Sequence, residues 1–437
     1  MFKPLPLLLL LAGVLNPPSA AERPYLDAAL GAERWLRSVA VAQPDGVAWP
    51  IDPDQERQMA DNLYTGSAGV VLFYLELARA TGDAAYLEPA RRGANRFLAE
   101  LPADLDPGAA SLYVGYGGVA FVLNETAKAT RDDRYRAGAR RIVHWIETSA
   151  KPAGKGVEWS PVTDIIAGSA GIGLTLLYFA DELGDREALR LATLAGHRLV
   201  ELARPEAVGL SWEMQAGFAR VMPNFSHGTA GVAYFLASLF LATHDRTFLD
   251  AALAGGQHLK AIARCEGGKC LIRHHHGDGE DLFYLSYCHG PAGTGRLFLR
   301  LYQATGDRRW LQWADRGVEA ILASGIPEGR TPGFWNNVGQ CCGGAGIGEF
   351  LMNLDHFRGE TRHRPFVERL ARDILTRATP ANGGLEWVQA EHRIQPDLLV
   401  AQTGFMQGAA GVGLFFLHLD AEARGDEWVL RLPDDPF

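Results

Sequence analysis

The sequence predicts an all-α fold, namely an α/α toroid, or double-layered barrel, made of seven helical hairpin repeats. The first supporting observation is a G-x-x-G tetrad that recurs seven times, at 66–69, 115–118, 168–171, 228–231, 290–293, 343–346 and 408–411. The other two are the apolar stretch that follows each tetrad and the amphipathic stretch that comes after it. A recurrence every 49 to 65 residues is typical of a repeat architecture.

The two stretches of each repeat predict an inner and an outer helix. Segments such as 70–78 and 232–241 are apolar on nearly all sides, as expected of helices buried all round. A short polar turn follows, and segments such as 86–98 and 310–323 then carry charges on one face. Residues 24–40 supply the outer helix that precedes the first tetrad.

Stacked helical pairs can form a closed ring or an open superhelical solenoid. Closure is favoured because the inner segments are uniformly apolar, and because neither terminal repeat has the polar face that an open array needs at its ends. Segments 151–161 and 382–402, between repeats, are long enough to hold short strands or loops over one mouth of the barrel.

The tetrad glycines have a structural explanation. Glycine at the start of a buried helix lets backbones approach closely and leaves main-chain N–H groups exposed at the N-terminus. If all seven inner helices start at the same end, their positive dipole ends converge on one mouth of the barrel. Side chains at equal offsets from the tetrads then form a ring at that mouth.

Bulk properties restrict the classes of function. Of 437 residues, 47% are hydrophobic and 21% are charged, as in a soluble globular protein with an ample core. The net charge of −9 is spread along the chain without a basic run, so nucleic acid and anionic membranes are poor partners. No apolar stretch is long enough for a transmembrane segment.

Residues 1–21 have the pattern of a secretory signal peptide. Lys3 supplies the positive flank, residues 5–15 the apolar core, and the small residues at 19–21 the cleavage site. The alternative is an uncleaved anchor or a chance hydrophobic start. We therefore expect an exported protein, periplasmic or secreted, in which residues 22–437 form one toroid domain.

Five cysteines need a role in an oxidising compartment, where thiols end as disulfides or metal ligands. They are Cys265, Cys270, Cys288, Cys341 and Cys342. Cys265 and Cys270 flank a short turn and could close a small loop as a disulfide. That leaves an odd set of three, which disulfide pairing alone cannot use up.

These three cysteines share offsets from their tetrads. Cys288 and Cys341 lie two residues before the fifth and sixth tetrads, and Cys342 lies one residue before the sixth. Thiols at facing helix N-termini predict a zinc site, since helix dipoles lower thiol pKa values and thiolates suit zinc. Three protein ligands leave a fourth position for an incoming thiol, the catalytic pattern. The alternatives are cysteines buried as small hydrophobic residues, or a Cys341–Cys342 disulfide with Cys288 free.

Other polar residues should line the same arc of the mouth. His227 lies one residue before the fourth tetrad, equivalent to His289 and Cys342, and Asp164 lies four before the third. His227 could move a proton near neutral pH, although a lone histidine is usually structural. Asp164 could orient it or merely cap a helix. The histidines at 274–276 could bind metal, but their charged, glycine-rich surroundings are more typical of an exposed loop.

Three motifs include consecutive tetrads and the residues just before them: SHGTAG from residue 226, YCHGPAG from residue 287 and CCGGAG from residue 341. With the sevenfold repeat, they resemble the lanthionine synthetase C-like family over essentially the whole chain after the signal. That family includes bacterial lanthipeptide cyclases and eukaryotic glutathione-adding relatives. Its members are α/α toroids with a catalytic zinc at the barrel mouth, and they add a cysteine thiol to dehydroalanine or dehydrobutyrine in a Michael reaction.

The resemblance implies a role for each motif residue. It assigns Cys288 and Cys341 as zinc ligands, with Cys342 as the third ligand where the family more commonly has histidine. His227 matches the histidine proposed to protonate the enolate, and Asp164 matches the aspartate thought to assist it.

Two further positions bear on how far the resemblance extends. Tyr284 stands where bacterial cyclases commonly carry an arginine, and His289 fits the variant of eukaryotic relatives. Cyclases normally act in the cytoplasm on peptides that a separate dehydratase has modified, whereas this chain carries an export signal.

The expected function is zinc-dependent activation of a thiol, with a peptide or small thiol as substrate and a separate dehydratase as partner. One alternative is a secreted carbohydrate-processing toroid. It is disfavoured because Asp164 stands alone at the mouth, where hydrolysis needs two carboxylates. The other is a non-catalytic zinc-bearing protein that binds thiols or peptides.

Overall fold

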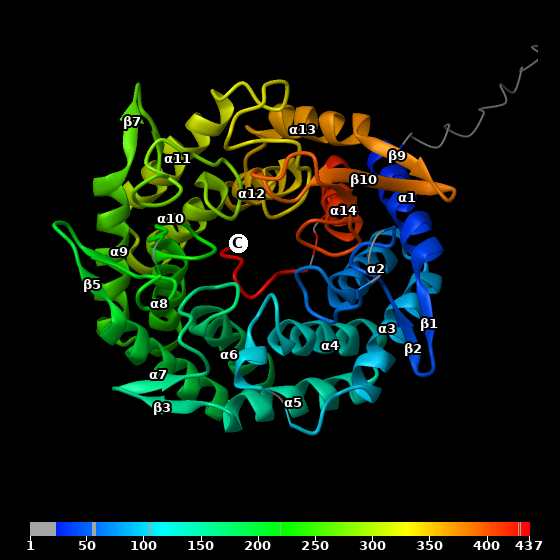
Figure 1. The fold of residues 1–437 in the computed structure, drawn as a ribbon, viewed down its shortest axis with the longest axis horizontal. Coiled ribbons are helices and arrows are strands. Elements are labelled where there is room, and N and C mark those ends of the chain that lie inside the picture. The colour runs from blue at the N-terminus through cyan, green and yellow to red at the C-terminus, as the bar shows by residue number, and fades with distance from the viewer. Residues whose placement is uncertain (1–22, 55–57, 105, 219, 427, 429) are drawn as a thin grey trace, which may run out of the picture.

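Two concentric layers of helices form a closed ring in the computed structural model (Figure 1). The structure describes residues 23–54, 58–104, 106–218, 220–426, 428 and 430–437, so the expected signal peptide lies outside it. The inner helices are α2 (Ser67–Thr81), α4 (Tyr116–Thr130), α6 (Ser169–Leu183), α8 (Thr229–Thr243), α10 (Pro291–Thr305), α12 (Gly344–Arg358) and α14 (Ala409–Arg424). The outer helices are α1 (Pro24–Val39), α3 (Leu87–Ala99), α5 (Asp133–Thr148), α7 (Arg186–Leu202), α9 (Arg246–Ile262), α11 (Arg309–Leu322) and α13 (Arg364–Thr376). The predicted α/α toroid is confirmed.

Each inner helix begins directly after the first glycine of its tetrad. The preceding loop folds back against the helix start so closely that no side chain fits between them. A Cβ atom at Gly228 would lie 1.5 Å from the carbonyl oxygen of Met222, and one at Gly293 would lie 1.9 Å from that of Tyr287. Only glycine permits this approach. The glycines therefore fix the positions of the residues just before them, which include the predicted site residues.

Main-chain hydrogen bonds join the loops before the tetrads into a ring at one mouth. In each link, the residue two positions before one tetrad donates its N–H to the equivalent carbonyl of a neighbouring repeat. Among the described residues, six of the seven possible links are present, at 2.9–3.3 Å: Met406 to Tyr64, Tyr64 to Tyr113, Tyr113 to Ile166, Ser226 to Cys288, Cys288 to Cys341 and Cys341 to Met406. Within this described set, the bond between Ile166 and Ser226 is missing from the series. Because Met406 belongs to the seventh repeat and Tyr64 to the first, the ring is closed. The open solenoid is therefore excluded.

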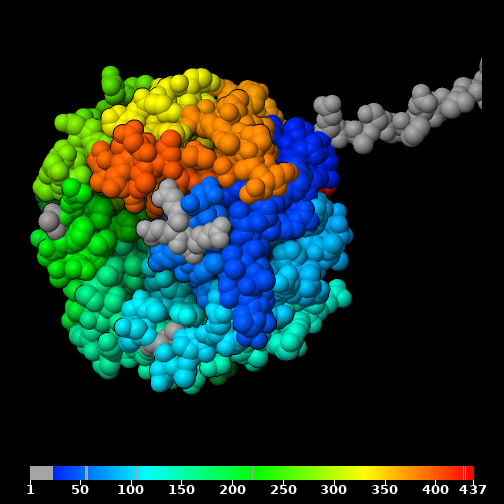
Figure 2. Space-filling model, turned by 45° about the vertical axis from the view of Figure 1, so that its right-hand side comes forward, coloured from blue at the N-terminus to red at the C-terminus, as the bar shows by residue number. Residues whose placement is uncertain are grey.

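Contacts between the two ends of the repeat array agree with this closure. Helix α14 packs against both α1 and α2. Figure 2 shows the same junction from outside, with the orange segments of the last repeat lying beside the blue N-terminal helix. Among the residues that the structure describes, no helix combines the length and the apolar character that a membrane span requires.

Short β-hairpins fasten successive outer helices to one another. They are β1–β2 (Val41–Gln43, Gly46–Ala48), β3–β4 (Lys151–Ala153, Gly156–Glu158), β5–β6 (Arg204–Pro205, Leu210–Ser211), β7–β8 (Arg264–Glu266, Lys269–Leu271) and β9–β10 (Ala378–Ala381, Gly384–Ala390), the last extended by β11 (Leu399–Ala401). Each hairpin follows one outer helix and packs on the next, with β2 on α3, β4 on α7, β6 on α9, β8 on α11 and β10 on α1.

The strands expected within 151–161 and 382–402 are thus confirmed. Strand β10 also reaches the mouth as expected, because Gln389 accepts the N–H of Val338 and donates to the carbonyl of Gln407, in the loops before the sixth and seventh tetrads. Hairpin β3–β4 does not, and it lies at the outer edge of the ring (Figure 1). The reason is that a glycine in the hairpin allows close docking on the helix backbone. A Cβ atom at Gly156 would lie 1.9 Å from the carbonyl oxygen of Leu194 on α7.

In four of the outer helices, a tryptophan indole binds a carbonyl group in the last turn. In each, the tryptophan Nε1 donates to a helix carbonyl thirteen residues earlier, at 2.7–3.0 Å. The pairs are Trp49–Leu36, Trp159–Ile146, Trp212–Leu199 and Trp387–Ile374. Carbonyl groups in the last turn of a helix lack intrahelical partners, so these indoles satisfy them.

Hairpin β7–β8 is joined in a different way. Ile272 stands thirteen residues after Leu259 of α9, where the other hairpins have tryptophan. Here Cys265 and Cys270, which face each other across the two strands, form a disulfide. The expected small-loop disulfide is confirmed.

The chain ends in the middle of the ring, where Figure 1 shows residues 430–437 in red. Asp434 is fully buried there. Arg300 and Gln303 of α10 donate hydrogen bonds to the carbonyl oxygens of Asp435 and Pro436. Part of the barrel interior is therefore filled by a segment that belongs to no repeat.

Candidate metal centre

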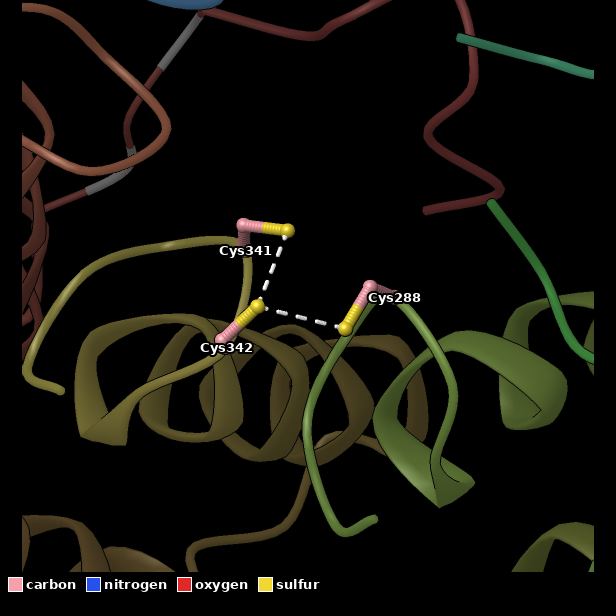
Figure 3. Close-up of side chains that lie close together, drawn as sticks. All are labelled: Cys288, Cys341 and Cys342. Carbon is pink, nitrogen blue, oxygen red and sulfur yellow. Dashed lines mark hydrogen bonds between the residues drawn. The ribbon is translucent and has the colours of Figure 1, made fainter. Parts of the chain in front are cut away.

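Three cysteine thiols meet at the mouth of the barrel (Figure 3). The loops before α10 and α12 carry them, and the Sγ atom of Cys342 lies 3.3 Å from the Sγ atoms of both Cys288 and Cys341. All three side chains are buried, and their sulfur atoms lie within 4.8 Å of one another. They are free thiols, so the alternative of a Cys341–Cys342 disulfide is wrong.

The donor set and its dimensions fit a zinc ion. In a tetrahedral site with Zn–S bonds of about 2.3 Å, the sulfur atoms lie about 3.8 Å apart. The two separations of 3.3 Å from the Cys342 sulfur are about 0.5 Å shorter than that value, so small rotations of the side chains would bring these atoms to tetrahedral spacing. Within the described part of the chain, no other group of three or more His, Cys, Asp or Glu side chains gathers its ligand atoms so closely.

The protons of the three thiols are shared unequally. Burial raises the pKa of the Cys288 thiol, but hydrogen bonds from Cys341 and Cys342 outweigh it and hold that pKa well below its usual value. Donation to the Cys288 sulfur raises the pKa of both Cys341 and Cys342 in return. Of the three thiols, Cys288 therefore has the lowered pKa, and a bound cation would favour ionisation of the other two.

A histidine–aspartate pair lies on the same mouth, in the two preceding repeats. The Nδ1 atom of His227 lies 2.6 Å from Oδ2 of Asp164, and Oδ1 of Asp164 accepts the N–H of Ala167 at 2.8 Å. Of the two alternatives for Asp164, the structure shows the partner of His227; its bond to Ala167 closes the turn before α6, but it does not cap that helix, whose N-cap residue is Gly168. Asp164 is buried, whereas the side chain of His227 remains 31% exposed.

The environment of His227 favours its charged form. Burial lowers the pKa of this imidazole, but the hydrogen bond and the negative charge of Asp164 raise it by more, and the nearby Cys341 adds to the increase. The net pKa lies above the usual histidine value. Because Nδ1 is engaged by Asp164, Nε2 is the atom that can exchange a proton with a molecule in the mouth.

Comparison with known protein families identifies the family of this chain. The model of the family described as lanthionine synthetase C-like protein matches residues 57–429. The chain belongs to the lanthionine synthetase C-like family. A search of curated protein sequences finds no match.

Solved structures that resemble this lanthionine synthetase C-like chain share its toroid. One is a nisin cyclase, with a TM-score of 0.62 and 18% identity, covering 83% of this chain and 89% of that one. Another is an inactive variant of the α-1,6-mannanase GH76A of Salegentibacter sp. HEL1_6, in complex with α-1,6-mannotetrose. Its TM-score is 0.50 at 14% identity, covering 92% of this chain and 99% of that one. At these identities the likeness shows the fold alone.

Residues that the sequence did not single out surround the thiols. The Oγ atom of Ser286 lies 3.5 Å from Sγ of Cys288. Gln407 directs Nε2 at Sγ of Cys342, at 3.8 Å, and at the Tyr64 hydroxyl, at 3.4 Å. Tyr64 and Gln407 lie two and one residues before the first and seventh tetrads, so the offsets that located the cysteines would also have found them.

Aromatic rings form a wall beside the cluster. The ring of His274 lies 3.9 Å from that of His289 and 4.5 Å from that of Tyr284, between centroids. Tyr284 in turn packs against Trp335 at 5.2 Å. Tyr284 therefore presents an aromatic ring and a hydroxyl near the thiols, and burial followed by the charges of Cys288 and Cys342 raises the pKa of that hydroxyl.

The histidine run at 274–276 is not the exposed loop that the sequence indicated. His275 is buried and His274 is half-buried, while His276 is exposed. The reason is that main-chain bonds tie the segment down, from the N–H of His274 to Leu282 and from that of His276 to Val221. Burial and the neighbouring His275 lower the pKa of His274 to about 3, so its ring is neutral.

His289 is buried behind this wall. Its ring centroid lies 5.7 Å from that of His227, and within the described residues its Nδ1 atom has no hydrogen-bond partner. Burial, followed by the charges of His274 and His227, lowers its pKa well below the usual value. His289 is therefore a neutral neighbour of His227 rather than a second acid.

Proposed function

We propose that this protein is an exported, zinc-dependent enzyme that activates a thiol for Michael-type addition to a dehydroamino acid in a peptide. The observation that carries the proposal is the meeting of three buried thiols with a His227–Asp164 pair at one mouth of a toroid. Membership of the lanthionine synthetase C-like family supports it, as does the likeness in fold to a nisin cyclase.

Cys288, Cys341 and Cys342 would hold the zinc, with the thiol substrate as a fourth ligand. Bound zinc supplies a Lewis acid that keeps such a thiol deprotonated near neutral pH. The wall of Tyr284 and Trp335 would border the bound peptide.

The remaining steps use the chain's own groups. The thiolate sulfur gives an electron pair to the β-carbon of the dehydroamino acid, and the π electrons move to the adjacent carbonyl as an enolate. The imidazolium of His227 then gives its Nε2 proton to the α-carbon, and Asp164 holds the ring through Nδ1. A thioether results, and neutral His227 can accept the proton of the next thiol.

Metal content of the protein recovered from its exported location tests the centre. Zinc near one equivalent per chain is expected, and Cys341→Ala, which removes one thiolate, should lose it. A Ser238→Ala variant, which alters a hydroxyl on α8 outside the centre, should keep it. Metal-free protein with the three cysteines still reduced would refute the zinc centre.

Turnover is tested separately with a synthetic peptide that contains dehydroalanine and a cysteine, or with glutathione as the thiol. Mass spectrometry should show thioether formation that depends on zinc and on Cys341. A protein that binds zinc and peptide without forming a thioether would be the non-catalytic binding protein instead.

Export and a dehydratase partner belong to the proposal. Detection of the mature chain outside the cytoplasm, beginning near residue 22, would support the first. A dehydratase whose products are substrates here would support the second.

A carbohydrate-processing toroid is the competing candidate, because a mannanase shares the fold. The inactive variant of that mannanase has two consecutive aspartates replaced. In this chain, consecutive aspartates occur at 132–133, where α5 starts, and at 434–435, in the barrel interior. Neither pair lies at the mouth. Release of sugar from α-mannan by protein stripped of metal would favour this candidate.

A further inference from the structure

One buried carboxylate connects two sides of the barrel beneath the thiols. Oδ2 of Asp434 accepts a hydrogen bond of 2.6 Å from the Tyr287 hydroxyl, and Oδ1 accepts one of 3.0 Å from the Tyr113 hydroxyl. The two hydroxyls are themselves 3.3 Å apart. Tyr113 belongs to the loop before the second tetrad and Tyr287 to the loop before the fifth, so Asp434 braces loops that are not neighbours in the ring.

The brace ends next to a metal-centre thiol. Tyr287 directly precedes Cys288, whose N–H binds the carbonyl of Cys341. Phe225 packs against the Tyr287 ring at 5.4 Å from the side of the fourth repeat. Asp434 holds the hydroxyl of Tyr287 and Phe225 packs against its ring, so the Tyr287 side chain has little conformational freedom. Because Cys288 is the next residue, its backbone position is restricted as well.

The cost of burying Asp434 indicates a specific role. Arg296, which is also buried, lies 3.7 Å from the Asp435 carboxylate and 5.3 Å from the Tyr287 ring centroid, and it donates to the Asp434 carbonyl. Replacing buried ionic groups by apolar residues of similar volume is often neutral or stabilising. If this part of the barrel interior served stability alone, it could therefore be apolar. A carboxylate that accepts hydrogen bonds from two phenols instead fixes the orientation of both tyrosine side chains.

We infer that Asp434 is a positioning residue for Cys288: by holding Tyr287 from inside the barrel, it sets the place of the Cys288 thiol within the metal centre. This inference rests on the proposed zinc centre for its consequence, but the restraint on Cys288 exists without metal. Partners that orient metal ligands typically change metal affinity about 10–100-fold when they are removed.

Three variants and a control test the brace. Asp434→Ala removes both acceptors, Tyr287→Phe removes a single hydroxyl, and Asp434→Asn keeps the shape and one oxygen acceptor. Asp435→Asn is the matched control, since it alters the neighbouring carboxylate on the same arginine without touching either phenol. Zinc affinity is measured by competition with a chromophoric chelator, and the alkylation rate of each thiol is measured by mass spectrometry in metal-free protein.

Asp434→Ala and Tyr287→Phe should weaken zinc binding about 10–100-fold and speed alkylation of Cys288 more than that of Cys341. Asp434→Asn should restore much of both properties, and Asp435→Asn should resemble the unmodified protein. If Asp434→Ala does not fold, Tyr287→Phe and Asp434→Asn decide the matter.

Unchanged zinc affinity and unchanged Cys288 alkylation in Tyr287→Phe would overturn the brace and leave the zinc centre standing. An unmodified protein that binds no zinc would overturn the proposed function, while the alkylation rates in metal-free protein would still decide whether Asp434 positions Cys288. Equal acceleration of Cys288 and Cys341 would show general loosening and would also count against a positioning role.

Discussion

Single side chains at the mouth obtain their chemistry from partners in other repeats. His227 of the fourth repeat is held by Asp164 of the third, and Cys342 of the sixth faces Gln407 of the seventh. Counting positions back from each glycine tetrad located the cysteines, His227 and Asp164, because thiols, imidazoles and carboxylates are unusual there. Gln407 lies at one of these positions too, but it was not singled out, because an amide side chain does not by itself indicate catalysis or metal binding.

The pH dependence of the proposed thiol addition should report on His227. Its raised pKa means that the imidazolium is fully formed below the ordinary histidine pKa and is lost as the pH rises through the higher value in the folded protein. Because Asp164 causes that increase, Asp164→Asn should move the alkaline limb of the rate profile to lower pH.

The same substitution should lower the rate at neutral pH by about 10²–10⁴-fold if proton transfer limits turnover. Zinc content is the control and should not change. An alkaline limb that stays in place would assign the titration to another group.

At the scale of elements, the bounds of the helices were largely predictable and their attachments were not. The outer helix expected at 310–323 is observed as α11, Arg309–Leu322, because hydrophobic period and polar turns are local signals. Hairpin β3–β4 was expected over the mouth, yet it docks at the outer edge of the ring. Docking depends on Gly156 and its equivalents meeting a helix backbone that is distant along the chain, and no local pattern reports that contact.

The tryptophans that end the outer helices should each stabilise the fold by a similar amount. Trp212→Phe leaves the buried carbonyl of Leu199 without its donor, at a cost of about 1–3 kcal/mol in the free energy of unfolding. Trp49→Phe, which leaves the carbonyl of Leu36 without its indole donor, should behave alike, and urea denaturation measures both. Ile272→Leu, at the equivalent place in hairpin β7–β8, removes no indole bond and is the control. Equal stability of all three variants would mean that the indole bonds contribute nothing.

A carboxylate on α5 should make stability depend on pH. Burial, then the charges of Asp185 and Glu187 at the start of α7, raise the pKa of Glu147 to about 7. Such a group contributes stability below its unfolded pKa of roughly 4.5, and that contribution is lost as the pH rises toward 7.

Glu147→Gln should therefore raise the free energy of unfolding by about 2–3 kcal/mol at pH 8, where the unmodified chain must bury the charge. At pH 4 the two proteins should be nearly equal. A gain of the same size at both pH values would point to packing rather than to the charge.

Over the whole molecule, periodicity fixed the number of repeats and favoured closure, and the backbone ring through Met406 and Tyr64 agrees. Periodicity predicts nothing about segments outside the repeats. Residues 430–437 carry no tetrad and no amphipathic pattern, so nothing in the sequence indicated that they enter the barrel or that Asp434 meets two phenols there.

Binding of metal should stabilise the entire toroid, because the thiols bridge two repeats of a closed ring. At a zinc concentration 100 times its dissociation constant, mass action adds about 2.7 kcal/mol. The melting temperature should rise with zinc and fall with a chelator, and Cys288→Ala should abolish both responses. A melting temperature of the unmodified protein that does not change with zinc would contradict the proposed zinc centre.

The ring also constrains the order in which the molecule can fold. Contacts between adjacent repeats are local along the chain, whereas the bond from Met406 to Tyr64 must wait for nearly all of it, and loop closure of that span is slow. Cys288, Cys341 and Cys342 come from adjacent repeats, so they can meet before the circle is complete. If the repeats assemble in the order of the chain, the three thiols gather before the ring encloses them, and an oxidant and a metal ion then compete for exposed cysteines. Metal present during folding would in that case protect the thiols from oxidation.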